Sequence, residues 1–335
     1  MHSKIFLLGD FQSDNGPGMA NKQILSSLSR GYTVCYSKAR SKIGRTIEVL
    51  KKIVASDIIV ICSKSQINYL VIRLAKLFHK KSYYIMHGCS SFEAKLNNPN
   101  ISKRKLQSLM DYERLIVVNT DKTICVSEFF MNFMKRRMPE YKDKFAYIYN
   151  CIDMKRIKTQ ACPHDVRLSQ IASIGGGMKH KNILTISEAA QKLKPVLPVV
   201  VIGADGEDSV AIKAQSNTEW NGLMTHSDVI KVLSKSEIYV QNSTFETFGL
   251  AAIEALYSGC DLLISDHMGC KNLFSTLTDY DVINDVNDID EISKKLEYLR
   301  QNSNNERLMK GFRKECVSHQ WQLEKLTQIF GESNK

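Results

Sequence analysis

The chain has 335 residues, a length that predicts two domains of roughly 150 residues each. Its hydrophobic fraction of 43% and charged fraction of 24% are typical of a folded protein and exclude a disordered chain. The apolar runs are far shorter than the roughly 20 residues of a membrane-spanning helix. The N-terminus lacks the long apolar region of a signal peptide, and the nine scattered cysteines form no C-x-x-C pair. We therefore expect a cytoplasmic protein with buried, reduced thiols.

The net charge of +11 is unevenly distributed along the chain. Residues 1–150 carry 25 Lys and Arg against 11 Asp and Glu, a balance of +14, whereas residues 151–335 carry 21 against 24, a balance of −3. A strongly basic half indicates an anionic partner. Nucleic acid, anionic lipid headgroups and phosphorylated small molecules all fit, as does a solvated basic surface with no partner.

Short apolar runs alternate with amphipathic segments throughout the first half. Strands are predicted at residues 4–9, 32–36, 57–62, 82–86, 115–119 and 123–126. Helical spacing is present at residues 20–30, 43–55, 66–78 and 102–112. This alternation is typical of right-handed βαβ units that build a parallel sheet.

The same alternation restarts after a polar stretch at residues 153–167. Strands are predicted at 170–174, 198–203, 238–241 and 261–265, and helices at 182–192, 227–234, 248–258 and 288–300. The chain is thus expected to form an α/β fold of two Rossmann-like domains whose parallel sheets face a central cleft, with ligands at the carboxyl ends of the strands. The expected domains are residues 1–153 and 154–315, with a C-terminal helix in 316–335 that packs back on the first domain.

The most informative motif lies at residues 242–265, which read NSTFETFGLAAIEALYSGCDLLIS. Glu246 is in the turn after a strand, Phe248 to Leu250 open a helix, and Glu254 lies about two turns along it. Amides at a helix N-terminus favour an anion such as phosphate, and Gly249 lets that anion approach the backbone. Glu254, among small and apolar neighbours, suits the paired hydroxyls of a ribose. On the residues alone it is equally an exposed helical residue, and Glu246 a partner of the helix dipole.

This E-x7-E spacing resembles that of retaining GT-B glycosyltransferases of family 4, also called glycosyl transferases group 1. The resemblance implies that Glu246 contacts the donor sugar, that Phe248 to Leu250 contact the phosphates, and that Glu254 binds the nucleotide ribose. Asp261 departs from the pattern, since a proline is commoner there.

A glycine-rich basic loop, IGGGMKHKN at residues 174–182, also resembles the family. Lys181 takes the place of the family lysine that neutralises the donor diphosphate. The accompanying arginine would fall at Gly176, where it is absent, and Lys179 is its candidate substitute, although the two residue types are not interchangeable for bidentate phosphate binding. The alternative is a flexible glycine turn with surface lysines.

Two features of the first half match the family less specifically. In the loop at residues 9–22, GDFQSDNGPGMANK, Gly16 and Gly18 are expected to approach the donor phosphates or the acceptor. His87, at the carboxyl end of a strand, would contact the donor sugar, although a lone histidine there is more often structural. The candidate catalytic residues are thus His87, Glu246 and Lys181. The candidate donor-binding residues are Gly16, Gly18, Gly176, Gly177, Lys179, Lys181, Glu246, Thr247, Phe248, Gly249, Leu250 and Glu254.

Two acidic D-x-D strings, at residues 279–281 and 288–290, are interpreted as a solvated face and a helix N-terminus rather than a metal site.

The resemblance implies a metal-independent hexosyltransferase that needs no cofactor and uses a nucleotide-diphosphate-sugar, UDP-linked, as co-substrate. The acceptor would be a lipid-linked saccharide in bacterial surface polysaccharide assembly, reached from the anionic inner membrane face and without nucleic acid. The alternatives are a GT-B nucleotide-sugar epimerase and a non-catalytic nucleic-acid-binding protein. A Rossmann dehydrogenase is disfavoured because no G-x-G-x-x-G follows a strand. The sugar, base, acceptor and linkage are not encoded in a recognisable pattern.

Overall fold

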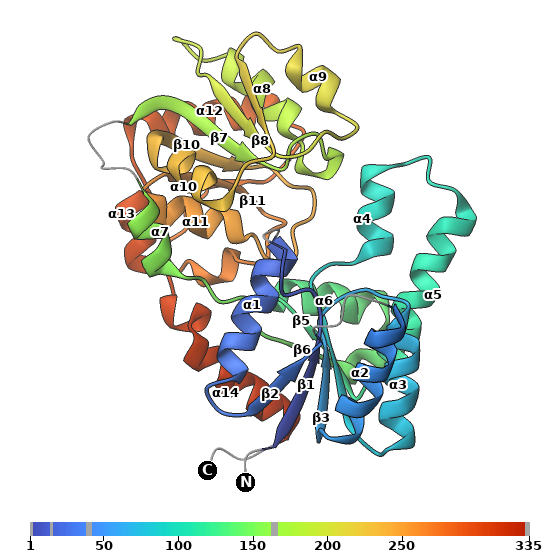
Figure 1. The fold of residues 1–335 in the computed structure, drawn as a ribbon. Coiled ribbons are helices and arrows are strands. Elements are labelled where there is room, and N and C mark those ends of the chain that lie inside the picture. The colour runs from blue at the N-terminus through green and yellow to red at the C-terminus, as the bar shows by residue number, and fades with distance from the viewer. Residues whose placement is uncertain (1–2, 14–15, 38–41, 162–166, 332–335) are drawn as a thin grey trace. The chain divides into compact units, whose positions relative to one another are not determined.

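A computed structural model describes residues 3–13, 16–37, 42–161 and 167–331. Its contacts divide the chain into two compact units. The first contains Met1–Ser91, Lys103–Cys151 and Glu315–Lys335, and the second contains Phe92–Ser102 and Ile152–Lys314. Each unit has one six-stranded sheet flanked by helices (Figure 1).

The first unit is built on a parallel sheet with the strand order β2-β1-β3-β4-β5-β6. Strand β3 is a continuous apolar run that is buried at every position, and β1 is apolar after Lys4, as expected for strands covered by helices on both faces. The strands are β1 (Lys4–Leu8), β2 (Thr33–Tyr36), β3 (Ile58–Ile61), β4 (Lys81–Met86), β5 (Lys122–Cys125) and β6 (Phe145–Tyr147). The helices are α1 (Gly16–Leu28), α2 (Lys42–Val54), α3 (Ile67–Leu77), α5 (Lys103–Asn119), α6 (Glu128–Arg137), η1 (Pro139–Lys144) and α14 (His319–Phe330). Helix α4 (Ser90–Asn97) belongs to the second unit from Phe92 onward, and η5 (Lys314–Val317) belongs to the first unit from Glu315 onward.

Two predictions in this half are corrected by the structure. Residues 115–119, expected as a strand, form the last turns of α5, and the buried side chains of Tyr112, Glu113, Ile116 and Val117 recur at helical spacing. The helix predicted from residue 20 begins at Gly16. The two glycines of the expected loop therefore lie in the first turn of α1, where Pro17 is also well tolerated.

The last helix, α14, is part of the first unit. Gln322, which is fully buried, accepts a hydrogen bond from Ser27 of α1 at 2.7 Å and donates one to the Tyr149 carbonyl at 2.9 Å. The ring of Phe330 packs on Tyr83 of β4 with centroids 4.6 Å apart. A segment from the C-terminal end thus completes the core of the unit that begins the chain.

The second unit has the sheet order β12-β11-β10-β7-β8-β9, again parallel throughout. Its core lies between the sheet and the helices α8 and α12 and is made of buried aliphatic residues such as Ile186, Val201 and Leu296. The strands are β7 (Leu168–Ile174), β8 (Val199–Ile202), β9 (Thr218–Gly222), β10 (Ser236–Gln241), β11 (Asp261–Ser265) and β12 (Val282–Ile283). The helices are α7 (Met154–Gln160), η3 (Lys179–Lys181), α8 (Ile183–Gln191), α9 (Ser209–Lys213), α10 (His226–Lys235), α11 (Leu250–Ser258), η4 (Lys271–Leu273), α12 (Ile289–Gln301) and α13 (Asn305–Gly311).

The order of these strands creates a topological switch point. From β7 the chain builds outward through β8 and β9, and then returns to add β10, β11 and β12 on the other side of β7. In open parallel sheets, ligands bind where the loops after two such neighbouring strands diverge. In this unit those loops are the ones that follow β7 and β10.

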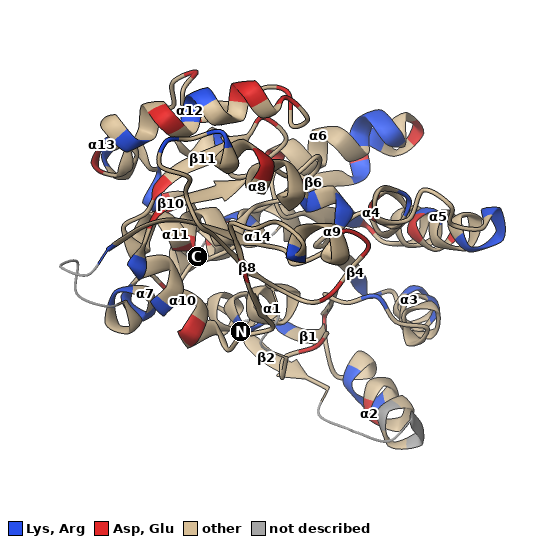
Figure 2. Cartoon of the chain, turned by 90° about the horizontal axis from the view of Figure 1, so that it is seen from above, with Lys and Arg blue, Asp and Glu red and all other residues tan. Residues whose placement is uncertain are grey.

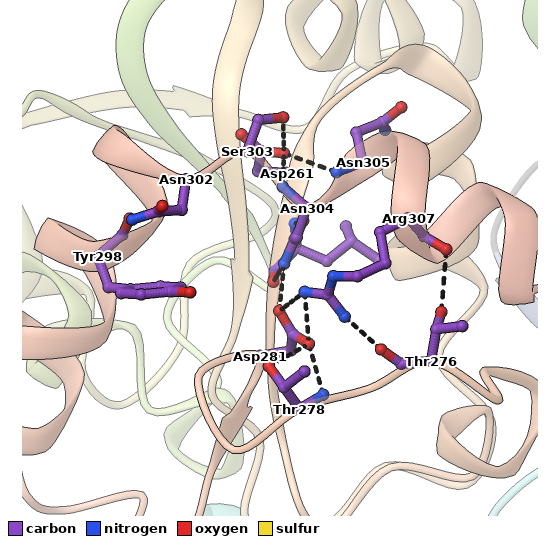
Figure 3. Close-up of polar contacts among 11 residues, drawn as sticks. Asp261, Thr276, Thr278, Asp281, Tyr298, Asn302, Ser303, Asn304, Asn305 and Arg307 are labelled. Atoms are coloured by element: carbon purple, nitrogen blue, oxygen red, sulfur yellow. Dashed lines mark hydrogen bonds and ion pairs between the residues drawn. The ribbon is translucent and has the colours of Figure 1, made fainter.

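The first D-x-D string is only in part the solvated face expected from the sequence, since Asp279 is exposed and Asp281 is not. Asp281 is fully buried and accepts hydrogen bonds from Arg307 Nη2 at 2.9 and 3.0 Å and from Asn304 Nδ2 at 2.7 Å (Figure 3). Asp288, in the second string, is the N-cap of α12, in line with the helix N-terminus predicted there. Among the described residues, no group of three or more His, Cys, Asp or Glu is arranged to hold a metal ion.

Asp261, the departure from the family pattern, belongs to the same polar network. Its Oδ1 accepts hydrogen bonds from the backbone amides of Asn304 at 2.7 Å and Asn305 at 2.8 Å and from the Ser303 hydroxyl at 2.7 Å (Figure 3). The carboxylate at the start of β11 therefore binds the amides at the N-terminus of α13, where negative charge is favourable.

The cysteines of the described chain are free thiols. Cys162 lies outside the described residues; of the other eight, Cys35 is partly exposed and seven are buried. Burial raises the pKa of Cys151 to about 12, which keeps that thiol protonated at neutral pH.

Candidate active site

The candidate site lies in the two loops at the switch point of the second unit. Lys181 ends η3 in the loop after β7, and Glu246 lies in the loop after β10. The Lys181 ammonium forms an ion pair with Glu246 Oε2, and each side chain is only 16% exposed. The structure thus brings together two residues that are 65 positions apart in the sequence.

Several groups fix Glu246 in this position. Its amide donates to the His267 carbonyl at 3.0 Å, and its own carbonyl accepts from the Gly269 amide at 3.0 Å. Gln241, the last residue of β10, donates from Nε2 to Glu246 Oε2 at 2.8 Å. Burial favours the neutral acid, but the charge and hydrogen bond of Lys181 outweigh it, so that the pKa of Glu246 lies below its ordinary value. Glu246 is therefore an ionised, oriented carboxylate.

The glycine-rich loop is shaped by close backbone packing. Gly176 has φ +57°, and a Cβ there would lie 2.1 Å from the Ala204 carbonyl oxygen. A Cβ on Gly177 would lie 2.0 Å from the Ser209 hydroxyl. The position assigned to the family arginine therefore admits no side chain at all. These two glycines let the loop after β7 pack against the loop after β8.

Lys179 does not join the Lys181–Glu246 pair. Its ammonium lies 3.4 Å from Glu207 Oε1, and the side chains of both residues are nearly half exposed. An exposed pair of this kind contributes little to stability.

The motif around Gly249 forms the start of α11. Gly249 is the N-cap, with φ +99°, and a Cβ there would lie 2.5 Å from Met268 Cε. Thr247 and Phe248 are buried, and the Phe248 carbonyl accepts from the Cys270 amide at 2.7 Å. The helix begins at Leu250, two residues later than predicted, and has no side-chain cap. Its N-terminus therefore keeps its positive end available for an anion.

Glu254, one helical turn further along, is not the exposed helical residue that the sequence left open. Its side chain is 18% exposed, and its Oε1 lies 2.9 Å from His226 Nε2. Burial, followed by the charges of Glu246 and Glu254, raises the pKa of Tyr239 well above its ordinary value. The charges of both carboxylates therefore reach one buried phenol in β10.

The remaining candidates lie in the first unit. A Cβ on Gly18 would lie 2.4 Å from the Ser13 carbonyl oxygen, so the start of α1 packs closely on the loop after β1, whereas Gly16 faces open space. His87, after β4, donates from Nε2 to Asn21 Oδ1 of α1 at 2.8 Å. Burial lowers the pKa of His87 to about 4, which makes it neutral at physiological pH.

Two residues of the site were missed by sequence reasoning. Gln241 is the polar residue that ends an otherwise apolar strand, a position that favours ligand or site contacts. His226 begins a helix with no motif around it, and its link to Glu254 depends on the packing of α10 against α11.

The segment that carries this geometry matches a known protein family. Residues 156–315, which contain Lys181, Glu246 and Glu254, match the family model described as "Glycosyl transferases group 1". The match agrees with the family resemblance recognised from the motifs, over just under half of the chain.

A curated relative comes from Campylobacter jejuni subsp. jejuni serotype O:2 and is 26% identical over 216 residues. It is N-acetylgalactosamine-N,N'-diacetylbacillosaminyl-diphospho-undecaprenol 4-alpha-N-acetylgalactosaminyltransferase. The match covers 62% of this chain and 57% of the relative, so the chain spans little more than half of that protein's length.

Solved structures establish the fold class. Sucrose-phosphate synthase from Thermosynechococcus elongatus has a TM-score of 0.72 and 16% identity, covering 99% of this chain and 100% of that chain. Anabaena HepE, in complex with UDP and glucose, has a TM-score of 0.66 and 12% identity, covering 98% of both chains. The fold is GT-B, as the sequence predicted. Among the described residues, no helix combines the length and hydrophobicity needed to cross a membrane.

Proposed function

We propose that this chain is a retaining glycosyltransferase that transfers a sugar from a nucleotide-diphosphate donor to an acceptor hydroxyl. The single observation that carries the proposal is the half-buried Lys181–Glu246 pair beside the uncapped N-terminus of α11, inside the segment that matches the family model. An ammonium and a positive helix end side by side suit a diphosphate, and an oriented carboxylate suits sugar hydroxyls.

In this proposal Lys181 and the first amides of α11 bind the donor diphosphate. Negative charge accumulates there as the sugar departs, so cationic groups placed beforehand stabilise the transition state more than the ground state. The Lys181 ammonium, which is paired with Glu246 in the free protein, then also binds the diphosphate. Glu246 accepts hydrogen bonds from the sugar. Glu254 accepts hydrogen bonds from the ribose of the nucleotide.

The proposed transfer proceeds on one face of the sugar. The bond from the anomeric carbon to the phosphate oxygen breaks, and the acceptor hydroxyl oxygen bonds to the same face of that carbon. The acceptor's proton passes to the departing phosphate oxygen, so the products are the glycosylated acceptor and a nucleoside diphosphate. Neutral His87 in the first unit fits a hydrogen-bonding contact to the sugar rather than a role as a proton donor.

We propose uridine as the base and a lipid-linked saccharide as the acceptor. HepE was solved with UDP, and the Campylobacter relative is named for a diphospho-undecaprenol acceptor. The first unit carries Lys and Arg along α2, α3, α5 and α6 (Figure 2). Beside them α2 and α3 expose apolar side chains, among them Ile47, Val54 and Leu77. Basic and apolar groups on the same helices suit the surface of an anionic membrane.

Thermal-shift measurements with UDP, GDP and ADP test donor binding. A ligand at about 100 Kd stabilises the protein by about 2.7 kcal/mol, so the matching nucleotide should raise the melting temperature by several degrees. Glu254→Ala should lose this shift, whereas Glu297→Ala, a control on the exposed surface of α12, should keep it. If no nucleotide raises the melting temperature of the wild type, the proposal is wrong.

Turnover separates the proposal from its alternatives. A transferase should release UDP from a UDP-sugar only when an undecaprenyl-diphosphate-linked saccharide is added, and should keep the donor's anomeric configuration in the product. An epimerase would convert the donor sugar without any acceptor. A nucleic-acid-binding protein would show salt-dependent retention of DNA or RNA and no nucleotide shift.

A further inference from the structure

His226 is joined to the candidate nucleotide site by a contact between two helices. It is the first residue of α10, whose N-cap Thr225 accepts a hydrogen bond from the Asp228 amide. The His226 ring points toward α11, where its Nε2 lies 2.9 Å from Glu254 Oε1. The two side chains are only 15% and 18% exposed, so water screens this contact weakly.

The partners of the ring define which nitrogen carries hydrogen. A carboxylate oxygen can only accept, so Nε2 is the donor. The other ring nitrogen, Nδ1, is buried and has no hydrogen-bond partner in the described part of the chain. A hydrogen on Nδ1 would be a buried donor without an acceptor, which costs more than a bare lone pair. The geometry therefore places a hydrogen on Nε2, which donates it to Glu254.

This arrangement uses one oxygen of Glu254 and leaves the other for a ligand. Within the described residues, Oε1 is bound by His226, whereas Oε2 accepts no hydrogen bond. A glutamate in a helix otherwise samples several rotamers, and fixing it before a ligand arrives reduces the entropy lost on binding. His226 thus selects the direction in which the free oxygen of Glu254 points.

We infer that His226 is a positioning residue that holds Glu254 ready to accept hydrogen bonds from the ribose hydroxyls of the donor nucleotide. The inference rests on the proposed function. It assigns to α10 a role in distinguishing ribonucleotides from their deoxy forms. A purely structural link between α10 and α11 would instead affect stability and would treat both forms of the nucleotide alike.

Two amide substitutions give a matched test. In His226→Gln the side-chain nitrogen reaches the place of Nε2 and can donate to Glu254. In His226→Asn the amide is one bond shorter, takes the place of Nδ1, and leaves Glu254 Oε1 unbound. Lys231→Ala, on the exposed face of α10, is the control. Isothermal titration with UDP, GDP and ADP first identifies the nucleotide that the wild type binds, and each variant is then titrated with that nucleotide and with its 2′,3′-dideoxy form.

H226N should bind the ribonucleotide about tenfold more weakly, as expected for a hydrogen bond to a charged group, and should bind the dideoxy form within twofold of the wild type. H226Q should recover most of the loss, and Lys231→Ala should show none. In an E254A background the substitution of His226 should have no further effect. Should H226N fail to fold, His226→Leu, which likewise cannot donate to Glu254, takes its place in the E254A cycle.

The inference is overturned if H226N binds the ribonucleotide as the wild type does, or if it weakens both forms equally. A wild type that binds a nucleotide, with His226 having no influence, would leave the proposed function standing. A wild type that binds none of the three nucleotides would overturn the proposed function and this inference with it.

Discussion

Replacing Lys181 by methionine should destabilise the second unit, because it leaves the Glu246 carboxylate without its cation. The two side chains are each 16% exposed, so the carboxylate would remain largely desolvated. Breaking a buried pair by removing one partner costs about 3–5 kcal/mol, and the residual exposure places this pair at the lower end, about 3 kcal/mol. Domains of 150–250 residues lose about 2–4 °C of melting temperature per kcal/mol. We therefore expect a decrease of about 6–12 °C.

The deficit should depend on pH in a defined direction. With Lys181 present, the pKa of Glu246 is below its ordinary value, so the pair's contribution is complete at neutral pH and is lost only as the pH falls through that lowered pKa. Without Lys181 only burial remains, which raises the pKa of Glu246. The penalty then develops as the pH rises past the unfolded value of about 4.3 and is complete above the raised pKa. The deficit should be larger at pH 8 than at pH 5.

Calorimetric melting of the ligand-free protein at both pH values checks this reasoning. Adding Glu246→Gln to the Lys181→Met variant should restore much of the stability, because the uncompensated charge is removed. Lys192→Met is the matched control. Lys192 forms an ion pair with Asp290 in which the side chains are 49% and 70% exposed, so this substitution should change stability by less than about 1 kcal/mol. A Lys181→Met protein that melts within about 2 °C of the wild type at pH 8 would refute the argument.

Three further outcomes are expected from other parts of the molecule. Gly176→Ala should lower the free energy of unfolding by about 3 kcal/mol in denaturant titrations, because a Cβ meets a carbonyl oxygen at 2.1 Å. Gly222→Ala, with a similar φ of +64° but no atom nearer than 3.9 Å, should lower it by about 1 kcal/mol, and equal losses would contradict the steric account. Arg307→Met should lower the free energy of unfolding by about 3 kcal/mol, since it removes the cation from a fully buried Asp281, whereas Arg307→Lys should lower it by less. An unchanged urea midpoint for Arg307→Met would show that the remaining hydrogen bonds of Asp281 suffice. Because the pKa of His87 is lowered to about 4, wild-type stability should decrease by about 3 kcal/mol in total as the pH falls from about 6.5 to 4. His87→Gln should remove this part of the decrease, and a pH profile of the variant parallel to that of the wild type would rule out the contribution of His87.

The fold was predictable from sequence where burial leaves a simple pattern. Strands such as β3 and β8 are buried at every position and read as uninterrupted apolar runs. The edge strand β9 was not predicted, because its residues TEWNG are half exposed and polar. The end of α5 was misassigned because Ile116 and Val117 are adjacent β-branched residues, and only their packing shows which secondary structure buries them.

The candidate site was predictable only as far as local motifs extend. Glu246, Glu254 and Lys181 could be named because each lies in a recognisable stretch of sequence. No local pattern could show that His226 contacts Glu254, since that contact depends on how two helices pack. The closeness of Gly176 to the next loop was equally hidden, and with it the reason that no arginine can occupy that position.

The position of α14 has a consequence for the order in which the chain matures during synthesis. All of the second unit, including the earlier segment Phe92–Ser102, has been synthesised once Lys314 has left the ribosome, whereas the first unit still lacks the helix that packs Phe330 against Tyr83. The half that is synthesised first is therefore finished last. Until then the side chains that α14 covers, Tyr83 among them, stay exposed, and a nascent chain stalled near residue 314 would display them to chaperones and proteases.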